Sequence, residues 1–121
     1  MLWAKIASIL MFLAVALGAF GAHALRDKLS AYGLDIFRTA VLYHFVHALG
    51  LFVVAWLASV TQDPRLFVAG ILFTVGIILF SGSLYVLAVT GVKWLGAITP
   101  LGGLSFLAGW IIVFLSVKTH G

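Results

Sequence analysis

Residues 66–92 read LFVAGILFTVGIILFSGSLYVLAVTGV, a run without formal charge that is bounded by Arg65 and Lys93. An α-helix rises about 1.5 Å per residue, so about 20 residues cross the hydrocarbon core of a bilayer, which is about 30 Å thick. Backbone groups in lipid must form their hydrogen bonds within their own segment, and a run of this length is therefore expected to be a transmembrane helix.

Three further uncharged runs have a similar length, at residues 6–25, 39–62 and 94–117. Together the four runs predict an all-α membrane protein, an antiparallel bundle of four transmembrane helices that forms a single domain over residues 1–121. The expected helices cover residues 3–25, 39–61, 66–89 and 100–118. The short polar turn around Pro64 makes the second and third helices antiparallel neighbours.

The composition excludes several classes of protein. Hydrophobic residues make up 64% of the 121 residues, charged residues only 8%, and the mean hydropathy is +1.27. A soluble domain carries about a quarter of charged residues, so a water-soluble fold is excluded. The net charge of +4 is spread along the chain rather than gathered in a basic run, which excludes a nucleic-acid partner. Without cysteine there is no disulfide framework and no thiolate metal site.

The start of the chain has some features of a signal peptide, since Lys5 precedes an apolar stretch and Ala22-His23-Ala24 fits an A-x-A cleavage site. The apolar stretch is longer than a typical signal core, so the first helix is expected to be retained. Trp residues are expected as an aromatic belt at the end of the bundle that holds the termini, namely Trp3, Trp56 and Trp110.

The connection over residues 26–38 is the longest segment of mixed charge. Leu25, Leu29, Tyr32 and Ile36 recur at helical spacing. This pattern predicts a short interfacial amphipathic helix between helices one and two, although Gly33 interrupts it. Its charges are expected to anchor it among the lipid headgroups, and they are Arg26, Asp27, Lys28 and Asp35. Arg38 follows at the start of helix two, where it could pair with Asp35 or Asp27 or bind an anionic headgroup.

Four motifs resemble a known family: GAFGAHAL at residues 18–25, YHFVHALG at 43–50, GSLY at 82–85 and TPLGG at 99–103. In this order they resemble the YgdD/YwdK-like family of small integral membrane proteins, which is classed as a domain of unknown function. The resemblance implies a four-helix, multi-pass protein of the bacterial inner (plasma) membrane. It implies no reaction, substrate or cofactor.

The histidines are the sharpest candidates for a functional site. His44 and His47 are three residues apart and share one face of helix two, while His23 ends helix one at the same membrane face. Ionisable groups inside a membrane are rare and are functional candidates by default. The full candidate polar cluster is His23, Arg38, Tyr43, His44, His47, Tyr85 and Thr99, in which the Tyr85 hydroxyl could reach either His44 or Thr99.

Three functional interpretations of the imidazoles stand beside a structural one. They could bind a divalent metal, relay protons from an ordinary pKa of about 6.5, or ligate a haem. Without a nearby carboxylate or cysteine, the favoured interpretation is neutral interhelical hydrogen bonding, and no metal or cofactor site is predicted.

Small residues recur at helical spacing on helices one and four, and they are Ala14, Gly18, Ala22, Gly102, Ser105 and Gly109. Such faces let helix backbones approach closely, so these residues are expected to pack helices together. They are only weak evidence for a homo-oligomer.

No catalytic residue is predicted. The three acidic residues are all aspartates in expected loops, and neither Ser81 nor Ser83 lies in a nucleophile motif. We expect a non-enzymatic membrane protein of structural or accessory role, with membrane lipid, a larger membrane complex or a homo-oligomer as partner. The alternative is an oligomeric transporter or channel, or a proton or metal site, that uses His23, His44 and His47.

Overall fold

A computed structural model describes residues 1–117 and confirms the all-helical prediction. Four helices are long and apolar enough to cross a membrane: Leu2–Leu25, Ala31–Thr61, Arg65–Thr90 and Lys93–Ser116. Their component segments, in chain order, are α1 (Leu2–Val15), η1 (Ala16–Gly21), α2 (Ala22–Leu25), α3 (Ala31–Thr61), α4 (Arg65–Gly76), η2 (Ile77–Gly82), α5 (Ser83–Thr90), η3 (Lys93–Ala97) and α6 (Thr99–Ser116).

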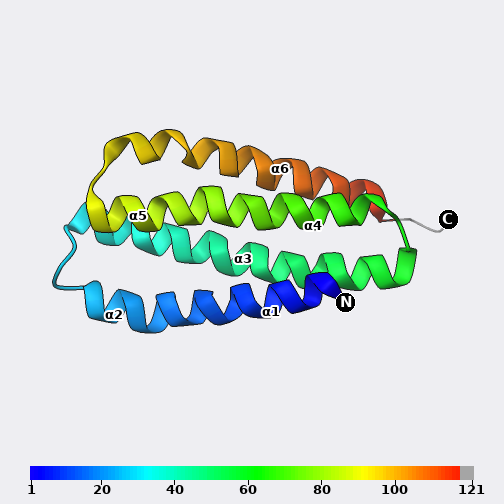
Figure 1. Ribbon diagram of the computed structural model, residues 1–121, viewed down its shortest axis with the longest axis horizontal. Coiled ribbons are helices and arrows are strands. Elements are labelled where there is room, and N and C mark those ends of the chain that lie inside the picture. Colours follow the sequence, from blue (N-terminus) through cyan, green and yellow to red (C-terminus); the bar gives the residue numbers. More distant parts are fainter. Residues whose placement is uncertain (118–121) are drawn as a thin grey trace.

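The helices run antiparallel to their chain neighbours, as predicted (Figure 1). α1 packs along α3, α3 packs along α4 and α5, and α4 packs along α6. In α3, half of the most apolar stretch is buried. In the first span, only 11% of the corresponding apolar stretch is buried. The third span is the other central helix, and α1 and α6 form the flanks.

The outer surface of the flanking helices is apolar. Phe12 and Phe20 on the first span are 73% and 74% exposed, and Phe114 on α6 is 78% exposed. Large apolar side chains left exposed along helices of this length indicate contact with lipid rather than water.

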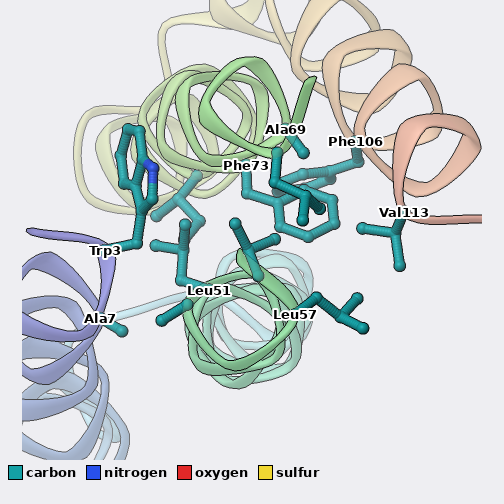
Figure 2. Packing of buried hydrophobic residues seen from close by; sticks show 12 residues of the cluster. Trp3, Ala7, Leu51, Leu57, Ala69, Phe73, Phe106 and Val113 are labelled. Atoms are coloured by element: carbon teal, nitrogen blue, oxygen red, sulfur yellow. The ribbon is translucent and has the colours of Figure 1, made fainter. Parts of the chain in front are cut away.

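The main core lies at the half of the bundle where α1 begins and α6 ends, and Figure 2 shows its side chains from all four spans. Ala7 contributes from α1, Leu51 from α3, Phe73 from α4 and Phe106 from α6. Glycines make this packing possible, since a Cβ at Gly70 would collide with the Trp3 ring. Trp3 is therefore buried in the core instead of lying in the predicted belt.

The structure corrects one detail of the predicted architecture. Residues 31–38 are not a separate interfacial helix but the first turns of a continuous α3, and residues 26–30 form the connection. The Ser30 side chain caps this helix by accepting a hydrogen bond from the Gly33 amide at 2.9 Å. Gly33 does not interrupt the helix, because the missing side chain lets it lie against the Ala88 carbonyl.

Two further boundaries differ from expectation. The last span begins with the 3-10 turn η3, and α6 begins at Thr99, one residue before the predicted start of this helix. The predicted end of this helix at Lys118 lies outside the described residues. Two π-helical turns, η1 and η2, were not predicted; each spans six residues and lies within a transmembrane helix.

Candidate functional site

His47 is buried on α3 with both ring nitrogens hydrogen-bonded. The indole Nε1–H of Trp110 on α6 donates to His47 Nε2 at 3.0 Å, and His47 Nδ1 lies 2.8 Å from the Tyr43 carbonyl oxygen. An indole N–H can only donate and a carbonyl can only accept. His47 is therefore neutral, with its proton on Nδ1.

Aromatic rings hold the His47 imidazole in place. Phe106 stacks on it with ring centroids 3.5 Å apart and planes 7° apart, and Phe73 meets it edge-on at 5.4 Å. The Phe106 ring can reach this position because Gly76 has no side chain to collide with it. We call His47, the Tyr43 carbonyl, Trp110, Phe106 and Phe73 the His47 site.

His44 lies one turn earlier and faces another pair of helices. Its Nδ1 lies 2.8 Å from the Tyr85 hydroxyl on α5. Of the two partners that the sequence suggested for this hydroxyl, His44 and Thr99, the structure therefore shows His44. The side chain is only 3% exposed, and its buried Nε2 forms no hydrogen bond within residues 1–117. The backbone of Leu10 on α1 approaches the same imidazole. We call His44, Tyr85 and the Leu10 carbonyl the His44 site.

Small hydroxyl side chains complete the polar contacts between helices. Ser81 donates to the Ala40 carbonyl at 2.7 Å, and Ser105 donates to the Leu72 carbonyl at 2.6 Å. Ser83 and Thr99 share a hydrogen bond of 2.7 Å. Each contact gives a buried or half-buried polar group the partner that it needs in an apolar surrounding.

The three histidines do not form the common cluster that the sequence suggested. His23 is exposed at the end of the first span, while His44 and His47 are buried and turn to different helices. Within residues 1–117 no group of three His, Cys, Asp or Glu side chains could hold a metal ion. Shared helix ends bring residues to one membrane face but do not set the direction in which a side chain points.

The predicted interfacial charges lie at the surface. Arg38 is exposed on the outer side of α3, and its side chain forms no ion pair with Asp35 or Asp27 in the part of the chain described. The other members of this group are exposed as well, and they are Arg26, Asp27, Lys28 and Asp35. This exposed setting fits contact with headgroups and water, as snorkelling side chains at helix ends require.

The small residues singled out in the sequence fall into two groups. On α6, Gly102 lies against the Phe80 backbone, Gly109 lies against the Phe73 ring, and Ser105 bonds to α4. On the first span, Ala14 is fully buried, while Gly18 and Ala22 are half-buried. Gly18 lies against Val41 of α3.

A groove of about 580 Å³ opens on the outer surface beside the His47 site. Tyr43 and Phe80 form one part of its lining, and Leu104 and Leu107 of α6 form another. Leu104 and Leu107 are exposed and the lining is mainly apolar, so the groove fits an acyl chain or an apolar helix better than a polar solute.

Sequence reasoning missed Trp110, Phe106 and Leu10. Trp110 was assigned to the aromatic belt, although it is only 37% exposed and its N–H is bound to His47. One signal could have found the α6 pair: Phe106 and Trp110 are four residues apart, on a helix whose glycines at 102 and 109 mark a closely packed face. Nothing in the sequence distinguishes the Leu10 carbonyl from its neighbours.

Comparison with known proteins identifies the relatives of this chain. The family described as "Protein of unknown function (DUF423)" matches residues 17–103. UPF0382 membrane protein YwdK of Bacillus subtilis (strain 168) is 50% identical over 109 residues, which cover 89% of each chain. UPF0382 membrane protein SH2409 of Staphylococcus haemolyticus (strain JCSC1435) is 44% identical over 104 residues, or 86% of this chain and 84% of the relative. No solved structure matches significantly.

Proposed function

The chain belongs to the DUF423 family, whose relatives are membrane proteins, and from this we propose that it is a non-enzymatic accessory protein of the membrane. In this role it binds lipid or a larger membrane complex through its apolar outer surface. The proposal accounts for a bundle in which the buried side chains of His44, His47, Ser81 and Ser83 connect one helix to another.

The observation that carries the proposal is that both ring nitrogens of His47 already form hydrogen bonds. A metal ligand or general base needs a free ring lone pair, but the Nε2 lone pair of His47 accepts the Trp110 N–H at 3.0 Å. The Phe106 ring also covers one face of the imidazole. A histidine held in this way serves packing between α3 and α6.

The groove beside the His47 site is the surface we assign to the partner. Leu107 lines it and is 61% exposed, whereas Phe12, 73% exposed, lies on α1 at the other flank of the bundle. A bound lipid or helix in the groove would cover Leu107 and leave Phe12 in contact with bulk lipid.

The test is photo-crosslinking in the native membrane, with a photoreactive phenylalanine analogue at position 107 or, as the control, at position 12. We expect a discrete adduct from position 107, formed with one protein or one lipid class, and only bulk lipid adducts from position 12. Extraction into native nanodiscs should retain the same component in stoichiometric amount. Bulk lipid adducts from both positions, with the protein isolated alone, would contradict the proposal.

A further inference from the structure

We propose that His44 is a buried proton-binding site: its imidazole can take up a proton without losing its hydrogen bond to Tyr85, whereas a second proton on His47 would face the Trp110 N–H. This inference concerns a group that the accessory role does not use. It rests on the chemical nature of the hydrogen-bond partners of the two histidines, which are one turn apart on α3.

His47 lacks an acceptor for a second proton. A proton added to its Nε2 would point at the Trp110 Nε1–H, 3.0 Å away, and two donors would then face each other. Indole nitrogen has no available lone pair, so Trp110 cannot reverse the direction of the bond. Protonation would require the Trp110 ring to leave a site packed by Phe73, with a centroid distance of 4.7 Å.

His44 has a reversible partner at Nδ1. The Tyr85 hydroxyl lies 2.8 Å away and can donate to the neutral ring or, after rotation about its C–O bond, accept from the protonated ring. The same oxygen therefore serves both charge states, without movement of the tyrosine ring.

The other ring nitrogen of His44, Nε2, is buried without a hydrogen-bond partner within residues 1–117, and the Leu10 backbone of α1 approaches the imidazole. A carbonyl oxygen has two lone pairs, so the Leu10 carbonyl can accept from the imidazole as well as from its own helix. This arrangement favours the Nε2–H tautomer of neutral His44, with Tyr85 as the donor to Nδ1.

The segments packed around α3 near His44 contribute few titratable groups. α1 carries only Lys5, which is exposed in its first turns, η1 and η2 carry none, and α5 carries only Tyr85. On α3 itself the nearest are Tyr43 and His47, with the exposed Arg38 further towards its N-terminus. The two oxygens of Tyr85 and Leu10 are thus the groups that would stabilise an imidazolium here.

The proton transfer balances through Tyr85, which is partly exposed and lies near the start of α5. A hydronium ion gives a proton to the Tyr85 oxygen while the hydroxyl proton passes to His44 Nδ1. The products are water, neutral tyrosine and imidazolium. Hydrogen bonds from a charged donor are about twice as strong as neutral ones, so protonation should draw the imidazole towards the Leu10 carbonyl and hold α1 more firmly on α3.

The experiment is ¹⁵N NMR of histidine side chains in the full chain in lipid nanodiscs, titrated from about pH 8 to about pH 5 around the ordinary imidazole range. His23 and His120 are replaced by glutamine so that only the two buried histidines report. We expect His44 to change reversibly from the Nε2–H form to the doubly protonated form, and His47 to keep its neutral Nδ1–H pattern. Protonation of His47 before His44, or a neutral His44 throughout, would overturn the proposal.

A pair of tyrosine variants tests the mechanism. Tyr85→Phe removes the reversible partner, and we expect His44 to stay neutral at the pH where half of it is protonated in the parent protein. Tyr43→Phe removes a hydroxyl but keeps the carbonyl that His47 uses, so it should titrate like the parent. An unchanged His47 spectrum shows in each variant that the bundle is intact, and an unchanged His44 titration in Tyr85→Phe would refute the role of the hydroxyl.

Discussion

The His47 site and the His44 site lie on the same helix, one turn apart, and differ in what surrounds the imidazole. His47 is stacked against Phe106 and receives a hydrogen bond from Trp110, so α6 closes around it. His44 faces the first span and α5, bonds to the Tyr85 hydroxyl, and has no hydrogen-bond partner at Nε2 within residues 1–117, while the Leu10 backbone approaches the ring. Both side chains are nearly fully buried, at 4% and 3% exposure.

Burial alone therefore does not decide what a membrane histidine can do. A partner that can only donate holds the imidazole in one neutral tautomer, whereas a hydroxyl and a carbonyl allow two charge states. The same residue type on one helix face can thus serve packing in one position and proton binding in the next. Each substitution below disturbs one site and leaves the other as an internal control.

The largest effect is expected from Gly102→Ala, which should break the His47 site by displacing α6. A Cβ at this position would collide with backbone atoms of Phe80, which cannot move aside as a side chain can. We expect a loss of about 3 kcal/mol in the free energy of unfolding, measured by steric trapping in bicelles. Gly103→Ala is the matched control, because its Cβ would meet nothing closer than 3.9 Å. Equal stability of the two variants would contradict close packing of α6 on η2.

A smaller loss is expected from Ala14→Leu, which should break the His44 site from the other side. Ala14 is fully buried on α1, which packs along α3, so a larger side chain should push α1 and the Leu10 carbonyl away from His44. We expect a loss of about 2 kcal/mol and a changed His44 ¹⁵N spectrum, with the His47 spectrum preserved. Ala19→Leu adds the same atoms at an exposed position and should resemble the parent protein. A His44 spectrum that Ala14→Leu leaves unaltered would show that α1 does not contribute to the site.

The smallest change in stability, about 1 kcal/mol, is expected from Trp110→Phe, which removes the donor but keeps an aromatic ring. A proton on His47 Nε2 would then no longer face another donor, so His47 should be protonated in acid, although at a lower pH than His44 because phenylalanine offers no acceptor. A pH titration of the ¹⁵N spectrum measures this conversion. Trp56→Phe alters a tryptophan that is 62% exposed and should leave both histidines as they are. If His47 stays neutral in Trp110→Phe, the Trp110 bond is not what prevents its protonation.

Much of the fold could be predicted from where the charges lie. Runs such as residues 66–92 must be helical in lipid, and apart from the start of α3 their lengths place the ends of the spans close to those observed. The continuous start of α3 could not be predicted, because it depends on contacts across the bundle. A glycine such as Gly33 is expected to break a helix. In the structure, however, Gly33 packs inside α3 against the Ala88 carbonyl, which is 55 residues away in the sequence.

The candidate site was less accessible to prediction. The spacing of His44 and His47 correctly indicated a shared helix and interhelical hydrogen bonds, but it could not name partners such as Trp110, 63 residues away. A helical pattern gives the relative angle of two residues on one helix, and only packing sets how that helix is rotated against the others. The suggested approach of His23 to the pair failed for this reason.

The most direct test of the difference between the two sites is a through-hydrogen-bond ¹⁵N–¹⁵N coupling between Trp110 Nε1 and His47 Nε2, recorded at neutral pH in lipid. The structure predicts a cross-peak between these two nitrogens, with the His47 proton on Nδ1. A missing cross-peak, together with a His47 proton found on Nε2, would contradict the account.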